Sequence, residues 1–318
     1  MYLFYGVLLF IIGLIIIIFS GNWMVKNAVK ISSITGISQA LIGATIVSLA
    51  TTLPELSVTI FSSIGNLQNL AIGNAVGSVI FNLTFIVGIV LFFTRVKIHQ
   101  SILGRNFYFM VFTVIFIFIF SLFGLINRVT GSVLIIIFLM YFVLNIIEAN
   151  KNQPVHECIV KKFTNVDKKN LLYVIISFLV SSFFVAFGAK LLVENGELIA
   201  KTLNISDHII GVTIIAIGTS LPEVVTAISS IRQKSSSIAL GNTIGANVLS
   251  LTLLIGMSAI MEPSSLIFHS NITFVAIPII LLSCLVLYLP IKLKFCKYKL
   301  QGAVLLFLFL IYYLTVII

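Results

Sequence analysis

Charged residues are scarce in this sequence. Asp, Glu, Lys and Arg together make up 9% of its 318 residues, whereas 60% are hydrophobic. Soluble domains carry roughly 25% charged residues, because a folded surface in water needs them, so this composition excludes a soluble globular protein. It predicts an all-α polytopic membrane protein.

Cysteine clusters and nucleic-acid-binding patterns are also missing. Cys158, Cys284 and Cys296 lie far apart and form neither a CxxC motif nor a Cys/His metal site, so we interpret them as unpaired thiols. The net charge is +10, but the basic residues stand at the ends of apolar runs without interleaved aromatic residues. Such basic residues indicate membrane topology, and we expect no nucleic-acid partner.

Long apolar runs fill most of the chain. They are continuous and do not alternate with a period of two, which predicts helices and excludes a membrane β-barrel. The first run has no preceding basic residue and no cleavage site after it, so we expect a retained span and no signal peptide. Ten runs are long enough to cross a bilayer: 3–20, 37–63, 71–93, 106–125, 130–147, 171–193, 206–231, 239–261, 270–290 and 300–318.

The distribution of basic residues predicts the topology. With ten spans and an outside N-terminus, 16 of the 19 Lys and Arg residues fall on the cytoplasmic side, as the positive-inside rule requires. Both termini are therefore expected outside. The longest hydrophilic segment, 148–170, is expected to be a short cytoplasmic linker between a first half, 1–147, and a second half, 171–318.

The two halves share a repeated motif. Residues 43–55 read GATIVSLATTLPE and residues 211–223 read GVTIIAIGTSLPE, and a shift of 168 residues aligns them. The same shift aligns GNAVGS at 73–78 with GNTIGA at 241–246, so the repeated regions extend over 43–93 and 211–261. Since five spans per half is an odd number, the second copy enters the membrane from the opposite side. Inverted repeats of this kind are typical of secondary transporters.

Two carboxylates lie deep in apolar spans, one in each repeat. Of the nine acidic residues, seven fall in loops or at span ends, whereas Glu55 and Glu223 occupy equivalent positions inside the spans. The inverted symmetry brings them together, and like charges repel in a low dielectric unless they are protonated or bind cations. No Lys or Arg lies deep in any predicted span to neutralise them. We therefore predict that they bind a divalent cation or several monovalent ones.

Further oxygen ligands are predicted around each carboxylate. Pro54 and Pro222 have no N–H for the carbonyls of Ala50 and Gly218, four residues earlier, so those carbonyls are expected to be free. Carbonyl oxygens beside a broken helix are suited to calcium or sodium. Hydroxyl groups at the same level come from Thr51, Thr52, Thr219 and Ser220.

A second set of polar residues, in the third and eighth spans, is expected to form a wall of the site. Asn74, Ser78 and Asn82 recur at intervals of four, so they share one helical face. Their equivalents in the eighth span are Asn242, Ala246 and Ser250. For the additional amide of Asn247 we keep two interpretations, a hydrogen bond to a neighbouring helix and contact with an ion. The glycines of both motifs form GxxxG pairs, which we interpret as helix-packing contacts.

The motifs TTLPE at 51–55, GTSLPE at 218–223 and GNxxG at 73–77 and 241–245 resemble the alpha repeats of the calcium/cation antiporter superfamily, in particular prokaryotic sodium/calcium exchangers. The resemblance covers the whole ten-span plan. It implies an electrogenic antiporter that exports calcium in exchange for sodium by alternating access, with the first and sixth spans sliding against a more rigid core. It implies calcium and sodium as transported ions and no resident cofactor.

The resemblance also implies which residues hold the ions. Glu55 and Glu223 would be the central ligands, shared by calcium and sodium. Further oxygen ligands would come from both repeats: Thr51, Thr219, the backbone carbonyls of Ser48 and Ala216, Thr52, Ser220, Ser78, Asn82 and Ser250. Exchangers of this type usually have a serine at the position of Ala246 and an aspartate or asparagine at that of Ser250, so the sodium sites of this chain are expected to differ.

Other functions fit parts of this pattern. A proton-coupled or potassium-dependent calcium antiporter would use the same fold, with a desolvated carboxyl protonated in the return step of the proton-coupled form. A passive cation channel needs a continuous polar path, whereas the polar residues here concentrate at one level. A metal-dependent enzyme acting on lipids needs acids and histidines near the head groups, and none cluster there. We expect a monomeric transporter, and no enzyme, in the plasma membrane, which for a prokaryote is the inner membrane.

Overall fold

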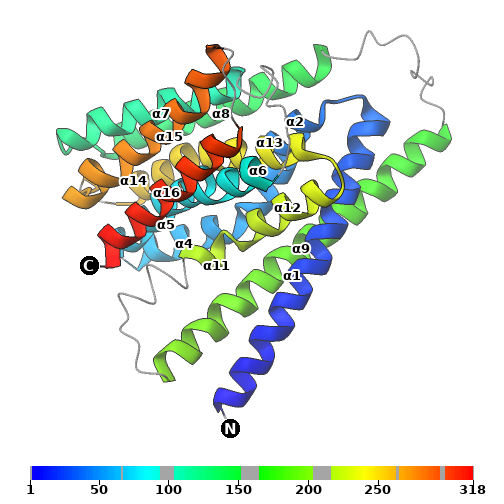
Figure 1. Cartoon of the computed structure of the whole chain (residues 1–318), viewed down its shortest axis with the longest axis horizontal. Coiled ribbons are helices and arrows are strands. Elements are labelled where there is room, and N and C mark those ends of the chain that lie inside the picture. The colour runs from blue at the N-terminus through cyan, green and yellow to red at the C-terminus, as the bar shows by residue number, and fades with distance from the viewer. Residues whose placement is uncertain are drawn as a thin grey trace.

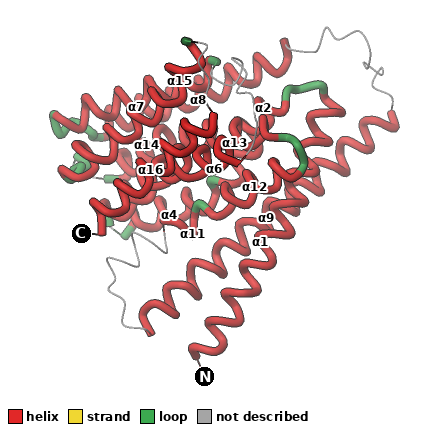
Figure 2. The backbone as a smooth tube through the Cα atoms, viewed as in Figure 1, coloured by secondary structure: helices red, strands yellow, loops and turns green. Residues whose placement is uncertain are grey.

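The computed structural model describes residues 2–65, 67–93, 104–151, 165–202, 216–262, 265–293 and 298–317. Within these ranges every regular element is a helix, and the one β-bridge joins Ile126 to Leu266 (Figure 2). The all-helical prediction is therefore confirmed for the described part of the chain.

Two long helices form a pair along one side of the molecule. Helix α1 (Tyr2–Thr35) and helix α9 (Asn165–Thr202) lie side by side (Figure 1). They come close where Gly13 and Gly188 meet, since a Cβ atom on either glycine would lie 3.0 Å from the backbone oxygen of the other. At about 1.5 Å per residue, both helices are longer than the roughly 30 Å of a bilayer core.

Helices α1 and α9 extend beyond the ends of the first and sixth spans that were predicted from the sequence. The prediction placed these span ends near residues 20 and 193, whereas α1 continues to Thr35 and α9 to Thr202. Hydropathy marks the apolar part of a helix, but helical backbone hydrogen bonds continue through polar residues such as Lys26 and Lys30. Helix α1 stops where Gly36 adopts a φ of 74°, a left-handed conformation that favours glycine.

The other helices form a compact group beside this pair (Figure 1). In the first half they are α2 (Gln39–Ile42), the π-helix η1 (Gly43–Val47), α3 (Ser48–Thr51), α4 (Leu53–Ile64), α5 (Gln68–Ile80), η2 (Phe81–Ile86), α6 (Val87–Phe93), α7 (Arg105–Leu122) and α8 (Arg128–Lys151). In the second half they are α11 (Ala216–Thr219), α12 (Leu221–Arg232), α13 (Ser236–Leu249), η4 (Ser250–Leu254), α14 (Ile255–Met261), η5 (Ile272–Ala276), α15 (Ile277–Lys292) and α16 (Tyr298–Ile317).

Not all of the ten predicted spans fall within the described ranges. Among the described residues, eight helices are long and apolar enough to cross a membrane, and the pair 39–51 and 53–64, bent by 45°, would make nine. The predicted span at 206–231 falls partly on residues 203–215, which lie outside the described ranges, as does most of the predicted linker. Helix α8 ends at Lys151 and helix α9 begins at Asn165.

The core of the compact group is formed by two continuous helical runs, 68–93 and 236–261. In the most apolar stretch of each run, 78% of the residues are buried. Helix α6 packs on α16, where Gly88 meets Gly302, and helix α14 packs on α8, where Gly256 meets Gly131. The outer helices carry exposed apolar side chains such as Phe19, Phe112 and Phe307, as expected of surfaces that face lipid.

Candidate functional site

Both deep carboxylates stand in the first turn of a helix that follows a break. Helix α4 begins at Leu53 after Thr52, whose φ and ψ are −81° and −1°, and α12 begins at Leu221 after Ser220, with −88° and 4°. In each case proline follows the first residue of the new helix, and the glutamate follows the proline. Because proline cannot donate a hydrogen bond to the preceding turn, the helix restarts at this point.

Glu55 and Glu223 are buried, each with 1% of its surface exposed. They belong to neighbouring segments, since the hydroxyl of Ser220, three residues before Glu223, donates to Oε1 of Glu55 at 3.3 Å. One oxygen of each carboxylate, Oε2, has no hydrogen-bond partner within the described part of the chain. Neither the Arg105–Glu148 nor the Lys190–Glu194 ion pair involves them. Buried negative charge without an opposite charge beside it is strongly unfavourable, so this arrangement favours cation binding.

The two repeats hold each other through reciprocal hydrogen bonds. The Thr51 hydroxyl donates to Oδ1 of Asn242 at 3.1 Å, and the Thr219 hydroxyl donates to Oδ1 of Asn74 at 3.2 Å. Residues 51 and 219, and likewise 74 and 242, are related by the same shift of 168 positions. Each broken helix, α3–α4 in the first half and α11–α12 in the second, is therefore bonded to the asparagine-bearing helix of the other half, α13 and α5 respectively.

A third contact is formed on one side only. The hydroxyl groups of Ser78 and Ser220 lie 3.1 Å apart, and that of Ser220 donates to Oε1 of Glu55 at 3.3 Å. The equivalents of Ser78 and Ser220 are Ala246 and Thr52. Because Ala246 has no hydroxyl, the buried Oγ1 of Thr52 lacks a partner among the described residues.

Asn82 presents another unpaired oxygen. Its Nδ2 donates to Oδ1 of Asn247 at 3.0 Å, whereas its own Oδ1 is buried and unpaired in the described structure. Asn82 lies in the π-helical turn η2, and Ser250 begins η4 at the equivalent place in the second half. Single π-helical turns inside α-helices occur frequently at functional sites.

The structure brings most of the predicted ligands together, but not all. Six of the eleven belong to hydrogen-bonded contacts between the halves: Glu55, Thr51, Thr219, Ser78, Ser220 and Asn82. Their roles as ion ligands stay predictions.

Ser48, Ser250 and Ala216 are connected differently. The Ser48 carbonyl already accepts the Thr51 hydroxyl at 3.3 Å and the Thr52 amide at 2.9 Å. Ser250 makes no hydrogen bond to another predicted ligand within the described ranges, and Ala216 begins α11, with its side chain outside the described structure.

One further contact beside the site was not predicted from the sequence. The Tyr141 hydroxyl, on α8, donates to the carbonyl oxygen of Ala44 in η1 at 2.8 Å. Tyr141 is fully buried and resembles any other aromatic residue of its span in sequence. Packing of the GxxxG glycines is clear in the second half, where a Cβ atom on Gly245 would lie 2.6 Å from the Ala44 oxygen.

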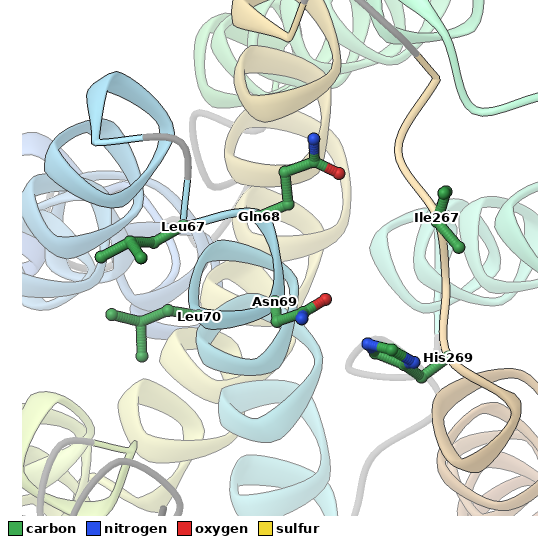
Figure 3. A pocket seen from close by; sticks show the side chains of 6 residues that line it. All are labelled: Leu67, Gln68, Asn69, Leu70, Ile267 and His269. Atoms are coloured by element: carbon green, nitrogen blue, oxygen red, sulfur yellow. The ribbon is translucent and has the colours of Figure 1, made fainter. Parts of the chain in front are cut away.

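A surface cavity of about 480 Å³ lies at the beginning of α5. Figure 3 shows Asn69 and His269 on opposite sides of it, together with Gln68. None of its lining residues is a predicted ligand, so the cavity is distinct from the carboxylate site.

Known proteins resemble this chain over almost its full length. It is 29% identical over 313 residues to the sodium/calcium exchanger MaX1 of Methanosarcina acetivorans, covering 86% of this chain and 89% of that protein. It is 28% identical over 261 residues to the inner membrane protein YrbG of Escherichia coli, covering 81% and 80%. A structure of the sodium-calcium exchanger NCX_Mj, soaked with sodium and strontium, superposes with a TM-score of 0.82 at 27% identity over 97% of both chains.

The family model for sodium/calcium exchanger proteins matches residues 5–147 and 173–318. These two segments include α3–α4 and α11–α12 with their carboxylates, α5 and α13 with their asparagines, and most of the long helices α1 and α9. The chain therefore belongs to the sodium/calcium exchanger protein family, a family of membrane transporters.

Proposed function

We propose that this protein exports calcium in exchange for sodium, with Glu55 and Glu223 as the ligands that both ions share. The observation that carries the proposal is the pair of buried carboxylates, each with an unpaired oxygen. Calcium takes six to eight oxygen ligands, carboxylates among them. Unpaired oxygens of Thr52 and Asn82 are available in addition to those of the carboxylates.

The proposed architecture is two inverted repeats that together make ten spans, with both termini outside. Support comes from the bonds Thr51–Asn242 and Thr219–Asn74. In each bond the threonine of one half contacts the asparagine of the other half, which is the pattern that a twofold axis between the halves would produce. The packing of α6 on α16 and of α14 on α8 follows the same pattern. In Figure 1 the C-terminal end lies at the left and the N-terminal end at the bottom, both away from the ends of α8 and α9 that flank 152–164, which lie towards the upper right.

The proposed mechanism is competition for one site combined with alternating access. Two carboxylates can be neutralised by one divalent ion or by several sodium ions. With either bound, the negative charge of the site is compensated within the membrane. The long pair of helices contacts the broken helices directly: α1 packs on α12, where Gly21 meets Val225, and α9 packs near Gly218 through Val193. A shift of this pair would change access to the carboxylates from either side.

The test is calcium flux into proteoliposomes, with sodium, potassium and proton gradients imposed separately. An opposing sodium gradient should drive calcium uptake in the wild type, whereas Glu55→Gln and Glu223→Gln should abolish it. Glu194→Gln is a matched control, since Glu194 is exposed and pairs with Lys190 at 3.7 Å. Full exchange by either site variant would refute the proposal.

The same experiment separates the alternatives. Calcium uptake driven by a pH gradient without sodium would identify a proton-coupled antiporter, and a requirement for potassium would identify a potassium-dependent one. Calcium flux without any counter-ion gradient would identify a channel. We further propose that the protein lies in the cytoplasmic membrane of a prokaryote, which the bacterial and archaeal relatives support, and that it acts as a monomer.

A further inference from the structure

Asn247 contacts a predicted ligand without being one. It is fully buried on α13, its Oδ1 accepts the hydrogen bond from Asn82 at 3.0 Å, and its Nδ2 faces Sδ of Met110 at 3.6 Å. The remaining polar atom of the Asn82 side chain, Oδ1, is buried and unpaired in the described structure. The amide pair therefore determines which end of Asn82 is left free.

The chemistry of the neighbours fixes the direction of this amide pair. A thioether sulfur accepts hydrogen bonds weakly and donates none. If the Asn247 amide were rotated by 180°, its oxygen would face the Met110 sulfur, acceptor against acceptor. Its Nδ2 would then donate to Asn82, whose own NH₂ group would become the free end. The observed direction satisfies both NH₂ groups and leaves an oxygen free.

We propose that Asn247 is a positioning residue that holds the Asn82 amide with its oxygen presented to the transported cation. The proposal rests on the proposed function, in which Asn82 is a ligand. An NH₂ group at this place would repel a cation, so the orientation of one amide decides whether Asn82 contributes to binding.

The device is present in one half of the molecule only. The position equivalent to Asn247 in the first repeat is Val79, and the position equivalent to Asn82 is Ser250. The single oxygen of a hydroxyl group can face an ion without help from a neighbour. An amide side chain has an oxygen end and a nitrogen end, so only one of its two orientations places an oxygen at the ion. The need for a positioning residue therefore arises only where the ligand is an amide.

The test combines Asn247→Leu with Asn82→Asp. In Asn247→Leu, the Asn82 amide is free to adopt both orientations, and apparent affinity falls in proportion to the competent fraction. We expect the calcium concentration for half-maximal exchange to rise roughly two- to tenfold, because about one hydrogen bond no longer favours the orientation of Asn82 that binds the ion. The maximal rate should change little. In the Asn82→Asp background both ends of the side chain are oxygens, so adding Asn247→Leu should change the half-maximal concentration by less than about twofold.

The control separates positioning from stability. Gln301 is another buried amide, on α16, and its Nε2 donates to the Val286 carbonyl at 2.9 Å. Gln301→Leu should lower thermal stability but leave the half-maximal calcium concentration unchanged. Asn247→Leu is compared in the wild type and in the Asn82→Asp variant. An equal loss of calcium affinity in the two proteins would overturn the proposal, because a residue with a merely structural role would affect both.

A binding measurement distinguishes this inference from the proposed function. Purified protein is heated in detergent with calcium chloride, strontium chloride or sodium chloride, and the shift of the unfolding temperature is recorded. Failure of all three salts to stabilise the wild type would refute the proposed function. Stabilisation of the wild type and of Asn247→Leu at the same ion concentrations would refute only the role of Asn247.

Discussion

Replacing Ala246 by serine should give Thr52 the hydroxyl partner that Ser220 already has in Ser78. Ser78 gives Ser220 a hydroxyl partner at 3.1 Å, whereas Ala246 gives Thr52 none, and the Thr52 oxygen is left unpaired in the described structure. In Ala246→Ser, a new hydroxyl stands at the position equivalent to that of Ser78. We expect it to pair with Thr52 and to provide one more oxygen for a sodium ion.

The expected magnitude follows from the hydrogen bond alone. A buried pair contributes about 1 kcal/mol net, which corresponds to about a fivefold change in an equilibrium constant. Ala246→Ser should therefore raise the free energy of unfolding by about 1 kcal/mol in cation-free buffer. The mirror variant Ser78→Ala should lower it by a similar amount, moderated because Ser220 also donates to Glu55 at 3.3 Å.

Two assays check this pair of variants. Thermal unfolding without cations measures stability, and the sodium dependence of calcium exchange in proteoliposomes measures whether the new oxygen binds an ion. The sodium concentration for half-maximal exchange should fall in Ala246→Ser and rise in Ser78→Ala. If Ala246→Ser does not stabilise the protein and Ser78→Ala does not destabilise it, the equivalence of the two contacts is refuted.

Three further predictions concern the contacts that hold the site. Gly241→Ala should destabilise the protein by about 2 kcal/mol or more, because its Cβ would overlap the backbone of α2; circular dichroism on heating measures the loss. Tyr141→Phe should cost about 1–2 kcal/mol, since the hydroxyl donates to the Ala44 carbonyl at 2.8 Å, and unchanged stability would show that this bond is not needed. Thr51→Val and Thr219→Val remove equivalent bonds of 3.1 and 3.2 Å, so their half-maximal calcium concentrations should rise by similar factors.

The class of protein and the position of the carboxylates follow from the sequence. Continuous apolar runs require helices in a bilayer, because no water is present there to satisfy backbone groups. The repeated TLPE and SLPE segments place one glutamate in each half, and the proline before it removes a backbone hydrogen bond, which favours a break in the helix. These are local properties, and the structure confirms the helices and the breaks at Thr52 and Ser220.

Contacts between segments far apart in the chain required the tertiary structure. Sequence spacing placed Asn74 and Asn82 on one face, but it did not show that the first bonds Thr219 or that the second bonds Asn247. Nor did it show that Ala246 leaves Thr52 unpaired, because that depends on which side chains meet across the interface between the repeats. The sequence predicted a cation site at two buried carboxylates. The packing of the repeats decided which oxygens beside them lack a hydrogen-bond partner in the described structure, since hydrogen-bond direction depends on neighbours in space.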